Sequence, residues 1–94
     1  MAADDLWMSP SYGTPCVGIH FTWKKDWEGV RTLLPRIQDE LAPFEPRPHW
    51  GKLFTTPPDR VQAVYERLPD FRRLLQKFDP QGKFRNLFLD RYVF

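Results

Sequence analysis

CVGIHFTW, the sequence of residues 16–23, is the clearest strand signal in the chain. It is dominated by β-branched and aromatic residues, which favour a pleated, half-buried strand. Side chains alternate between the two faces of a strand, so the large apolar residues would share one face. Those residues are Val17, Ile19, Phe21 and Trp23. His20 would lie on the opposite face, away from these large side chains.

The segments on either side of this strand predict a second short strand and a long helix. Leu6–Tyr12 alternates apolar residues imperfectly, and Pro10 restricts it to a short or edge strand. Asp26 is placed to cap a helix that we expect over Trp27–Ala42, where apolar residues recur at helical spacing. Pro35 lies inside this pattern and should kink the helix, because proline removes a backbone donor and clashes with the preceding turn.

The second half of the chain predicts short helices separated by proline-rich turns. His49–Phe54 is expected to be a short strand or a structured loop. Helices should begin at Pro57–Asp59 and again at Pro69, because proline suits the first helical turn. Asp79–Gly82 predicts a turn, and Asn86–Leu89 a last helical turn. The order of elements indicates an α+β fold, with a small mixed sheet of two or three strands packed against helices.

Composition limits the chain to one small domain or to part of a larger one. It has 94 residues, of which 41% are hydrophobic and 16% aromatic, so a core is possible. The net charge of +2 excludes a polybasic nucleic-acid arm. The single cysteine, Cys16, cannot form an internal disulfide or a thiolate metal site. The chain has no apolar run long enough to span a membrane and no signal peptide, so a cytoplasmic location is expected.

The number of large apolar side chains exceeds what so small a sheet could cover. The chain contains four tryptophans and eight phenylalanines. Two or three strands are few for an independent sheet. We therefore expect an incomplete unit, which either dimerises or packs against further sequence.

Two short segments stand out as possible sites of chemistry. The first contains His20, and the second is His49–Lys52, HWGK, which follows a Pro-Arg-Pro sequence. A lysine on such a segment could donate a hydrogen bond to a substrate oxygen, or act as a base if desolvated. The structural alternatives are a hydrogen-bonding strand histidine and a surface lysine. The chain lacks phosphate-binding glycine motifs and metal-ligand spacings, and nucleic-acid binding is not expected because the aromatics follow core periodicity.

Three motifs occur in an order that resembles a known family. They are Ala3–Pro10 followed by Gly18–Trp23, then Arg47–Lys52, and then Phe78–Asn86, which reads FDPQGKFRN. Together they cover essentially the whole chain. They resemble the C-terminal region of the alditol and xylitol oxidases, relatives of the sugar-1,4-lactone oxidases among the vanillyl-alcohol-oxidase-type flavoproteins.

This resemblance implies an FAD-dependent oxidase. Such enzymes carry FAD, usually attached covalently through a histidine of an N-terminal domain. They oxidise a terminal alcohol of a polyol such as xylitol or sorbitol by hydride transfer to the flavin, and oxygen is reduced to hydrogen peroxide. Residues 1–94 would then be the C-terminal part of the substrate (cap) domain, without the FAD-binding domain. Its partners would be the rest of its own chain, the substrate and oxygen, and the separate chain is expected to be inactive.

The resemblance also assigns roles to individual residues. Lys52 and His20 match the active-site lysine and histidine of the family, and both are expected to contact substrate and to take part in catalysis. Trp50 is expected either to line the polyol pocket or simply to pack. Asn86 is expected either to contact the flavin or to cap a helix or turn. No metal site is expected.

Three alternatives remain open from the sequence. An aldonolactone such as D-arabinono-1,4-lactone could replace the polyol as substrate. The chain could instead be an unrelated small module that dimerises through its aromatic surface. It could also be a degenerate relative of the enzyme, retained as an interaction protein.

Overall fold

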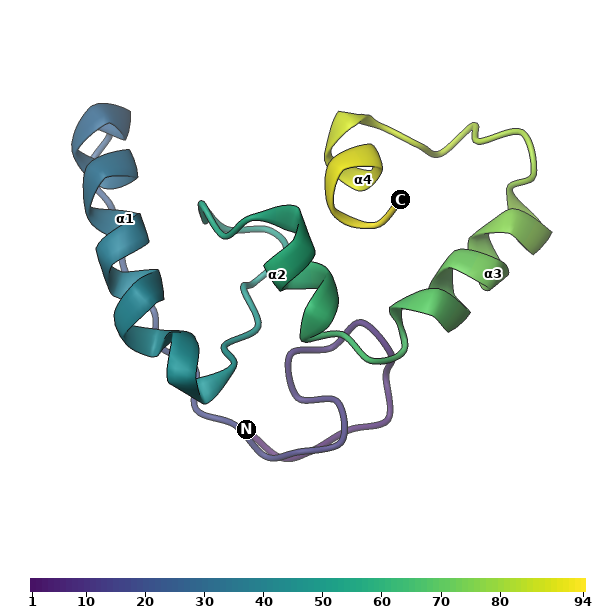
Figure 1. The fold of residues 1–94 in the computed structure, drawn as a ribbon, viewed down its shortest axis with the longest axis horizontal. Helices are drawn as coiled ribbons and strands as arrows, with labels where there is room; N and C mark the ends of the chain where they lie inside the picture. Colours follow the sequence, from purple (N-terminus) through teal and green to yellow (C-terminus); the bar gives the residue numbers. More distant parts are fainter.

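The computed structural model describes residues 1–94 as four short α-helices joined by long irregular segments (Figure 1). The elements are α1 (Trp27–Leu41), the 3-10 helix η1 (Ala42–Phe44), α2 (Pro58–Ala63), α3 (Leu68–Phe78) and α4 (Leu87–Tyr92). In Figure 1 the helices are spread around an arc, with α2 between α1 and α4, and they do not form a parallel bundle. The molecule measures 40 × 29 × 20 Å along its principal axes.

The helices begin where the local signals predicted. The Asp26 carboxylate accepts a hydrogen bond from the Gly29 backbone N–H at 3.1 Å and caps α1. Pro35 lies inside α1. Pro58 occupies the first position of α2, where its missing N–H would have no helical partner anyway. Glycine at position 82 has a positive φ of 65° in the turn before α4, a conformation that other residues rarely adopt.

The predicted sheet is wrong, and with it the α+β class. The structure contains no strand, and its only ladder contact is an isolated bridge between Asp4 and Tyr12. Leu6–Tyr12 forms turns, and His49–Phe54 is a turn followed by irregular chain. Within Cys16–Trp23, which has no regular secondary structure, Cys16 alone pairs with another residue, Met1. Val17–Trp23 makes no hydrogen bond to any other part of the chain. A strand is stabilised by cross-strand pairing, and these 94 residues supply no partner for it.

The core lies where α2, α4 and the start of α3 meet. We call it the core cluster, which consists of Val61, Tyr65, Leu68, Tyr92 and Val93. Half-buried aromatic side chains surround it, among them Trp50 and Phe54 from the segment before α2. The rings of Phe54 and Tyr92 meet edge to face, with centroids 5.0 Å apart. The core cluster therefore joins α4 to the segment that carries the HWGK motif.

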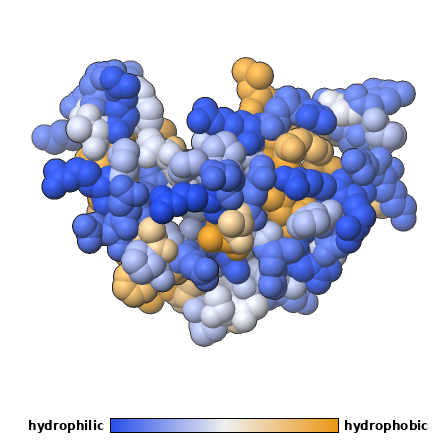
Figure 2. Space-filling view, viewed as in Figure 1, coloured by the Kyte–Doolittle hydropathy of each residue, from blue (hydrophilic) through white to orange (hydrophobic).

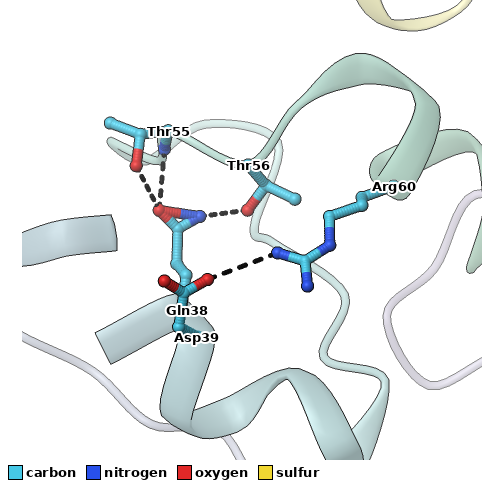
Figure 3. A network of polar contacts seen from close by, with 5 residues as sticks. All are labelled: Gln38, Asp39, Thr55, Thr56 and Arg60. Atoms are coloured by element: carbon cyan, nitrogen blue, oxygen red, sulfur yellow. Dashed lines mark hydrogen bonds and ion pairs between the residues drawn. The ribbon is translucent and has the colours of Figure 1, made fainter. Parts of the chain in front are cut away.

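Helix α1 contributes no residue to the core cluster, although it buries its own Val30 and Leu34. Polar contacts tie it to the start of α2 and the chain before it (Figure 3). The Gln38 side chain binds Thr55 and Thr56, which precede α2. One position further along, Asp39 forms an exposed ion pair with Arg60 of α2 at 3.4 Å. On another face of α1, Leu33 and Ile37 line a groove of about 400 Å³ together with residues of the extended segment.

Much of the apolar surface is exposed. Only 8 of the 94 residues are buried. Figure 2 shows hydrophobic side chains at the surface in several places rather than only in the interior. The large apolar side chains that remain exposed include Val17, Ile19, Phe21, Phe44, Phe78, Phe84 and Leu87. No helix combines the length and the apolar character needed to cross a membrane.

Candidate active site

Lys52 ends a tight turn that the HWGK motif forms. The Lys52 backbone N–H donates to the His49 carbonyl at 3.0 Å, and the Gly51 N–H donates to His49 Nδ1 at 3.0 Å. The Lys52 side chain is exposed and forms neither an ion pair nor a hydrogen bond. Its ammonium group is therefore free to bind an oxygen of a ligand that reaches this turn.

Arg47 anchors the beginning of this turn. Its Nε donates to the Val64 carbonyl at 2.9 Å, and its Nη1 donates to the Tyr12 carbonyl at 2.9 Å. Longer bonds from Nη1 reach the carbonyls of Ser9 and Pro10. A planar guanidinium suits such a divergent set of acceptors, because its five N–H groups point in fixed directions. Arg47 thus holds the motif against both the N-terminal turns and the end of α2.

Trp50 anchors the middle of the turn. Its indole Nε1 donates to the Met8 carbonyl at 3.0 Å, and its ring lies 4.9 Å from the ring of Tyr65. The ring also meets Phe88 of α4 edge to face at 6.1 Å. These contacts engage the indole within the fold, and they favour packing over a pocket-lining role for the Trp50 side chain.

His20 lies in the extended segment, and the structure does not join it to the HWGK turn. Its side chain is exposed and makes no hydrogen bond. No hydrogen bond or ion pair links His20 to Lys52 or Trp50. The neighbouring Ile19 and Phe21 side chains line the groove on α1, so α1 supports the segment that presents His20.

Asn86 caps helix α4. Its Oδ1 accepts a hydrogen bond from the Leu89 backbone N–H at 2.9 Å. Asp79 organises the preceding turn, because its carboxylate accepts from the backbone N–H groups of Lys83 and Phe84 at 2.8 and 2.9 Å. The helix that Asn86 caps carries Phe88, which contacts Trp50. The third motif is therefore connected to the HWGK turn through α4.

Burial beneath the turn changes the acidity of one side chain. Desolvation raises the pKa of the Tyr65 phenol from 10.0 to about 12, while the nearby Arg47 charge opposes the change. Tyr65 is 2% exposed, and its ring packs against the Trp50 ring. The turn that presents Lys52 therefore rests on a buried, uncharged phenol.

The motifs pointed to Lys52 and to Trp50, but they did not single out Arg47 or Gln38 as residues that fix the chain around Lys52. Arg47 stands between Pro46 and Pro48, which restrict its backbone. These prolines were a visible signal that the chain before the HWGK turn is rigid. Gln38 is a half-buried polar residue beside the apolar stripe of α1, which gave no comparable signal. No group of His, Cys, Asp and Glu side chains in the chain could hold a metal ion.

Comparison with known proteins identifies the family to which the chain belongs. The family model for D-arabinono-1,4-lactone oxidase matches residues 1–92, and the chain belongs to this family. An alditol oxidase from Streptomyces sp. is 49% identical over 89 residues, which are 95% of this chain and 21% of that protein. A long-chain alcohol oxidase from an uncultured marine euryarchaeote is 42% identical over 43 residues, 46% of this chain and 9% of that protein. The chain thus spans about a fifth of the length of the alditol oxidase.

Proposed function

We propose that residues 1–94 belong to an FAD-dependent oxidase that oxidises a terminal alcohol of a polyol, with oxygen as the electron acceptor. The observation that carries this proposal is the 49% identity to an alditol oxidase, which extends over 95% of the chain. The exposed, unpaired Lys52 on an anchored turn adds a chemical reason, since an ammonium group suits a hydroxyl that gains negative charge.

The proposed protein is larger than these 94 residues, which form part of its substrate domain. The backbone of Val17–Trp23 has no hydrogen-bond partner within the chain, and large apolar side chains are exposed beside it. Exposed apolar patches of this kind are typical of interfaces. Further sequence of the same polypeptide would cover them, which a dimer of the separate chain could do only in part.

Among the residues present, we infer a possible contact with FAD only for Asn86. The chain offers no glycine-rich loop for the pyrophosphate. Asn86 uses its Oδ1 as a helix cap, which leaves its amide N–H groups for a flavin edge. FAD, when bound, supplies the hydride acceptor for the alcohol carbon. The remainder of its site belongs to sequence outside residues 1–94.

In the proposed mechanism, Lys52 binds the hydroxyl oxygen that becomes the carbonyl oxygen of the product. A neutral Lys52 would accept the hydroxyl proton. A protonated Lys52 would instead stabilise the negative charge that develops on this oxygen, and the hydroxyl proton would pass to His20. His20 would hold the same or the neighbouring hydroxyl by a hydrogen bond. The pH profile of kcat/KM distinguishes the two states, because only the neutral form makes the rate rise with pH as Lys52 loses its proton.

The first experiment isolates the natural polypeptide that contains these residues and measures its mass, flavin content and peroxide production. We expect a protein several times heavier than 11.3 kDa, with bound flavin and activity on xylitol or sorbitol. A natural product of about this mass without flavin would overturn the proposal and favour the small interaction module.

Lys52→Met in that flavoprotein tests the assigned chemistry. Positioned proton transfer or charge stabilisation contributes on the order of 10²–10⁴ in rate, so kcat/KM should fall by about this factor. The flavin content should be unchanged, since the Lys52 side chain forms no ion pair and the backbone bond to His49 is kept in the variant. A loss below about tenfold would remove Lys52 from the mechanism.

Aldonolactone oxidation is the second candidate, because the matching family model is that of D-arabinono-1,4-lactone oxidase. The same purified protein should be compared on alditols, aldonolactones and long-chain alcohols. A higher kcat/KM on the lactone than on every alditol would replace the polyol in the proposal and leave the oxidase chemistry intact.

A further inference from the structure

We propose that Gln38 is a positioning residue that fixes the Lys52 turn relative to the segment that carries His20. This inference rests on the proposed function, because it concerns the placement of Lys52 for that chemistry. Gln38 itself touches neither residue. It acts through α1, which lines a groove with the His20 segment on one face. On another face, α1 binds the chain that follows Lys52 (Figure 3).

Phe54 packs the chain after Lys52 on the core cluster, and Gln38 supplies the hydrogen bonds of this segment. Across Leu53–Thr56, no backbone group bonds to another backbone group. The Thr55 N–H donates instead to Gln38 Oε1 at 3.0 Å, and the Thr55 hydroxyl donates to the same oxygen. Gln38 Nε2 donates to the Thr56 hydroxyl. One side chain therefore supplies the only backbone hydrogen bond of this segment and binds both threonines.

Another face of α1 lies beside the His20 segment. Ile19 and Phe21 line one groove with Leu33 and Ile37 of α1. Val17–Trp23 forms no hydrogen bonds, so this groove is where its side chains come next to α1. Ile37 and Gln38 are adjacent along α1, and thus a single turn of helix connects the two segments that carry His20 and Lys52.

The neighbouring Asp39–Arg60 pair is a natural comparison for this network. It joins the same two regions, because Asp39 follows Gln38 on α1 and Arg60 lies in α2 (Figure 3). Both of its side chains are more than half exposed, and such surface pairs contribute little. Gln38 and its threonine partners are half-buried, so loss of Gln38 leaves polar groups without partners.

The test uses the natural full-length flavoprotein with Gln38→Leu, and with Asp39→Asn as the matched control. A misplacement of about 1 Å can cost on the order of a hundredfold in rate. We expect Gln38→Leu to lower kcat/KM by about tenfold to a hundredfold at unchanged flavin content. Asp39→Asn should change it by less than about twofold. Thr56→Val removes the acceptor of Nε2 and should give part of the same loss, even if Gln38→Leu folds poorly.

A double-mutant cycle separates positioning from simple support of the fold. If Gln38 acts through Lys52, then Gln38→Leu should cost less than about twofold when Lys52 is already methionine. Hydrogen exchange of the peptide around Thr55 gives a readout independent of activity. Its amide should lose protection in Gln38→Leu and keep it in Asp39→Asn.

The outcomes distinguish this inference from the proposed function. If Lys52→Met lowers kcat/KM as expected but Gln38→Leu and Thr56→Val do not, the inference fails and the proposed function stands. Equal losses from Gln38→Leu in both Lys52 backgrounds would also overturn it, because Gln38 would then act independently of Lys52. If Lys52→Met is without effect, the proposed role of Lys52 fails first.

Discussion

Two regions of the molecule differ in how far they bury their apolar side chains and pair their backbone groups. One lies around α2 and α4, and the other lies around α1. The core cluster brings together residues that are 8% exposed or less, and no buried side-chain polar atom in the chain lacks a partner. Beside α1, Val17 is 87% exposed and the backbone of Val17–Trp23 is unpaired. The first region has a core of five buried apolar side chains, whereas α1 buries only Val30 and Leu34 and leaves the segment beside it exposed.

This difference bears on how the candidate site is assembled. The HWGK turn rests on the core cluster through Trp50 and Tyr65, so Lys52 has a firm base. His20 lies in the other region, where Val30 and Leu34 of α1 are the only buried apolar side chains. The relation between the two therefore depends on α1 and on the contacts of Gln38. Substitutions in the two regions should therefore differ in their effects on stability.

The largest loss in the free energy of unfolding should come from creating a cavity in the core cluster. Leu68 is 2% exposed, so Leu68→Ala should lower the free energy of unfolding of the α2–α4 region by about 2–5 kcal/mol. Glu66→Ala, an exposed change two residues earlier in the sequence, should stay within about 0.5 kcal/mol. Native-state hydrogen exchange of the α2 and α4 amides measures both. Equal effects of the two substitutions would mean that the core cluster does not stabilise this region.

An intermediate loss in the free energy of unfolding should occur at high pH, where the Tyr65 phenol ionises. Burial raises the pKa of its phenol to about 12 from 10.0, so the folded state binds the proton more tightly than the unfolded state. The stabilisation is complete below the unfolded pKa and is lost as the pH rises from about 10 through 12. Its size is about 3 kcal/mol. Thermal unfolding across this pH range should show the loss in the native protein and not in Tyr65→Phe.

The smallest effect should come from helix caps, and it should differ between the regions. Asn86→Ala removes the cap of α4 and should cost about 1 kcal/mol. Asp26→Ala removes the cap of α1 at a similar local cost. Because α4 packs on the core cluster, only Asn86→Ala should speed hydrogen exchange in α2. Asn86→Asp should keep the cap, and an unchanged flavin content in that variant would argue against a flavin contact through the Asn86 amide.

The sequence predicted the helices well because their signals are local. Asp26 and Asn86 are side chains that cap a helix within three residues, and Pro58 fits a first turn without any distant contact. The presence of a sheet could not be predicted from local signals in the same way. CVGIHFTW has the composition of a strand, but a strand requires a hydrogen-bonded neighbour, and no other segment of the chain provides one.

The sequence by itself determined the family and the residues available for chemistry, because motifs such as HWGK are read directly from the order of residues. It also determined where helices begin, because caps and prolines act over a few residues. Only the tertiary structure decided that Trp50 turns its indole N–H to Met8, that Arg47 reaches four backbone carbonyls, and that Gln38 binds Thr55 and Thr56. These partners lie far away in the chain, and distance in sequence carries no signal for such contacts until the backbone has brought the groups together.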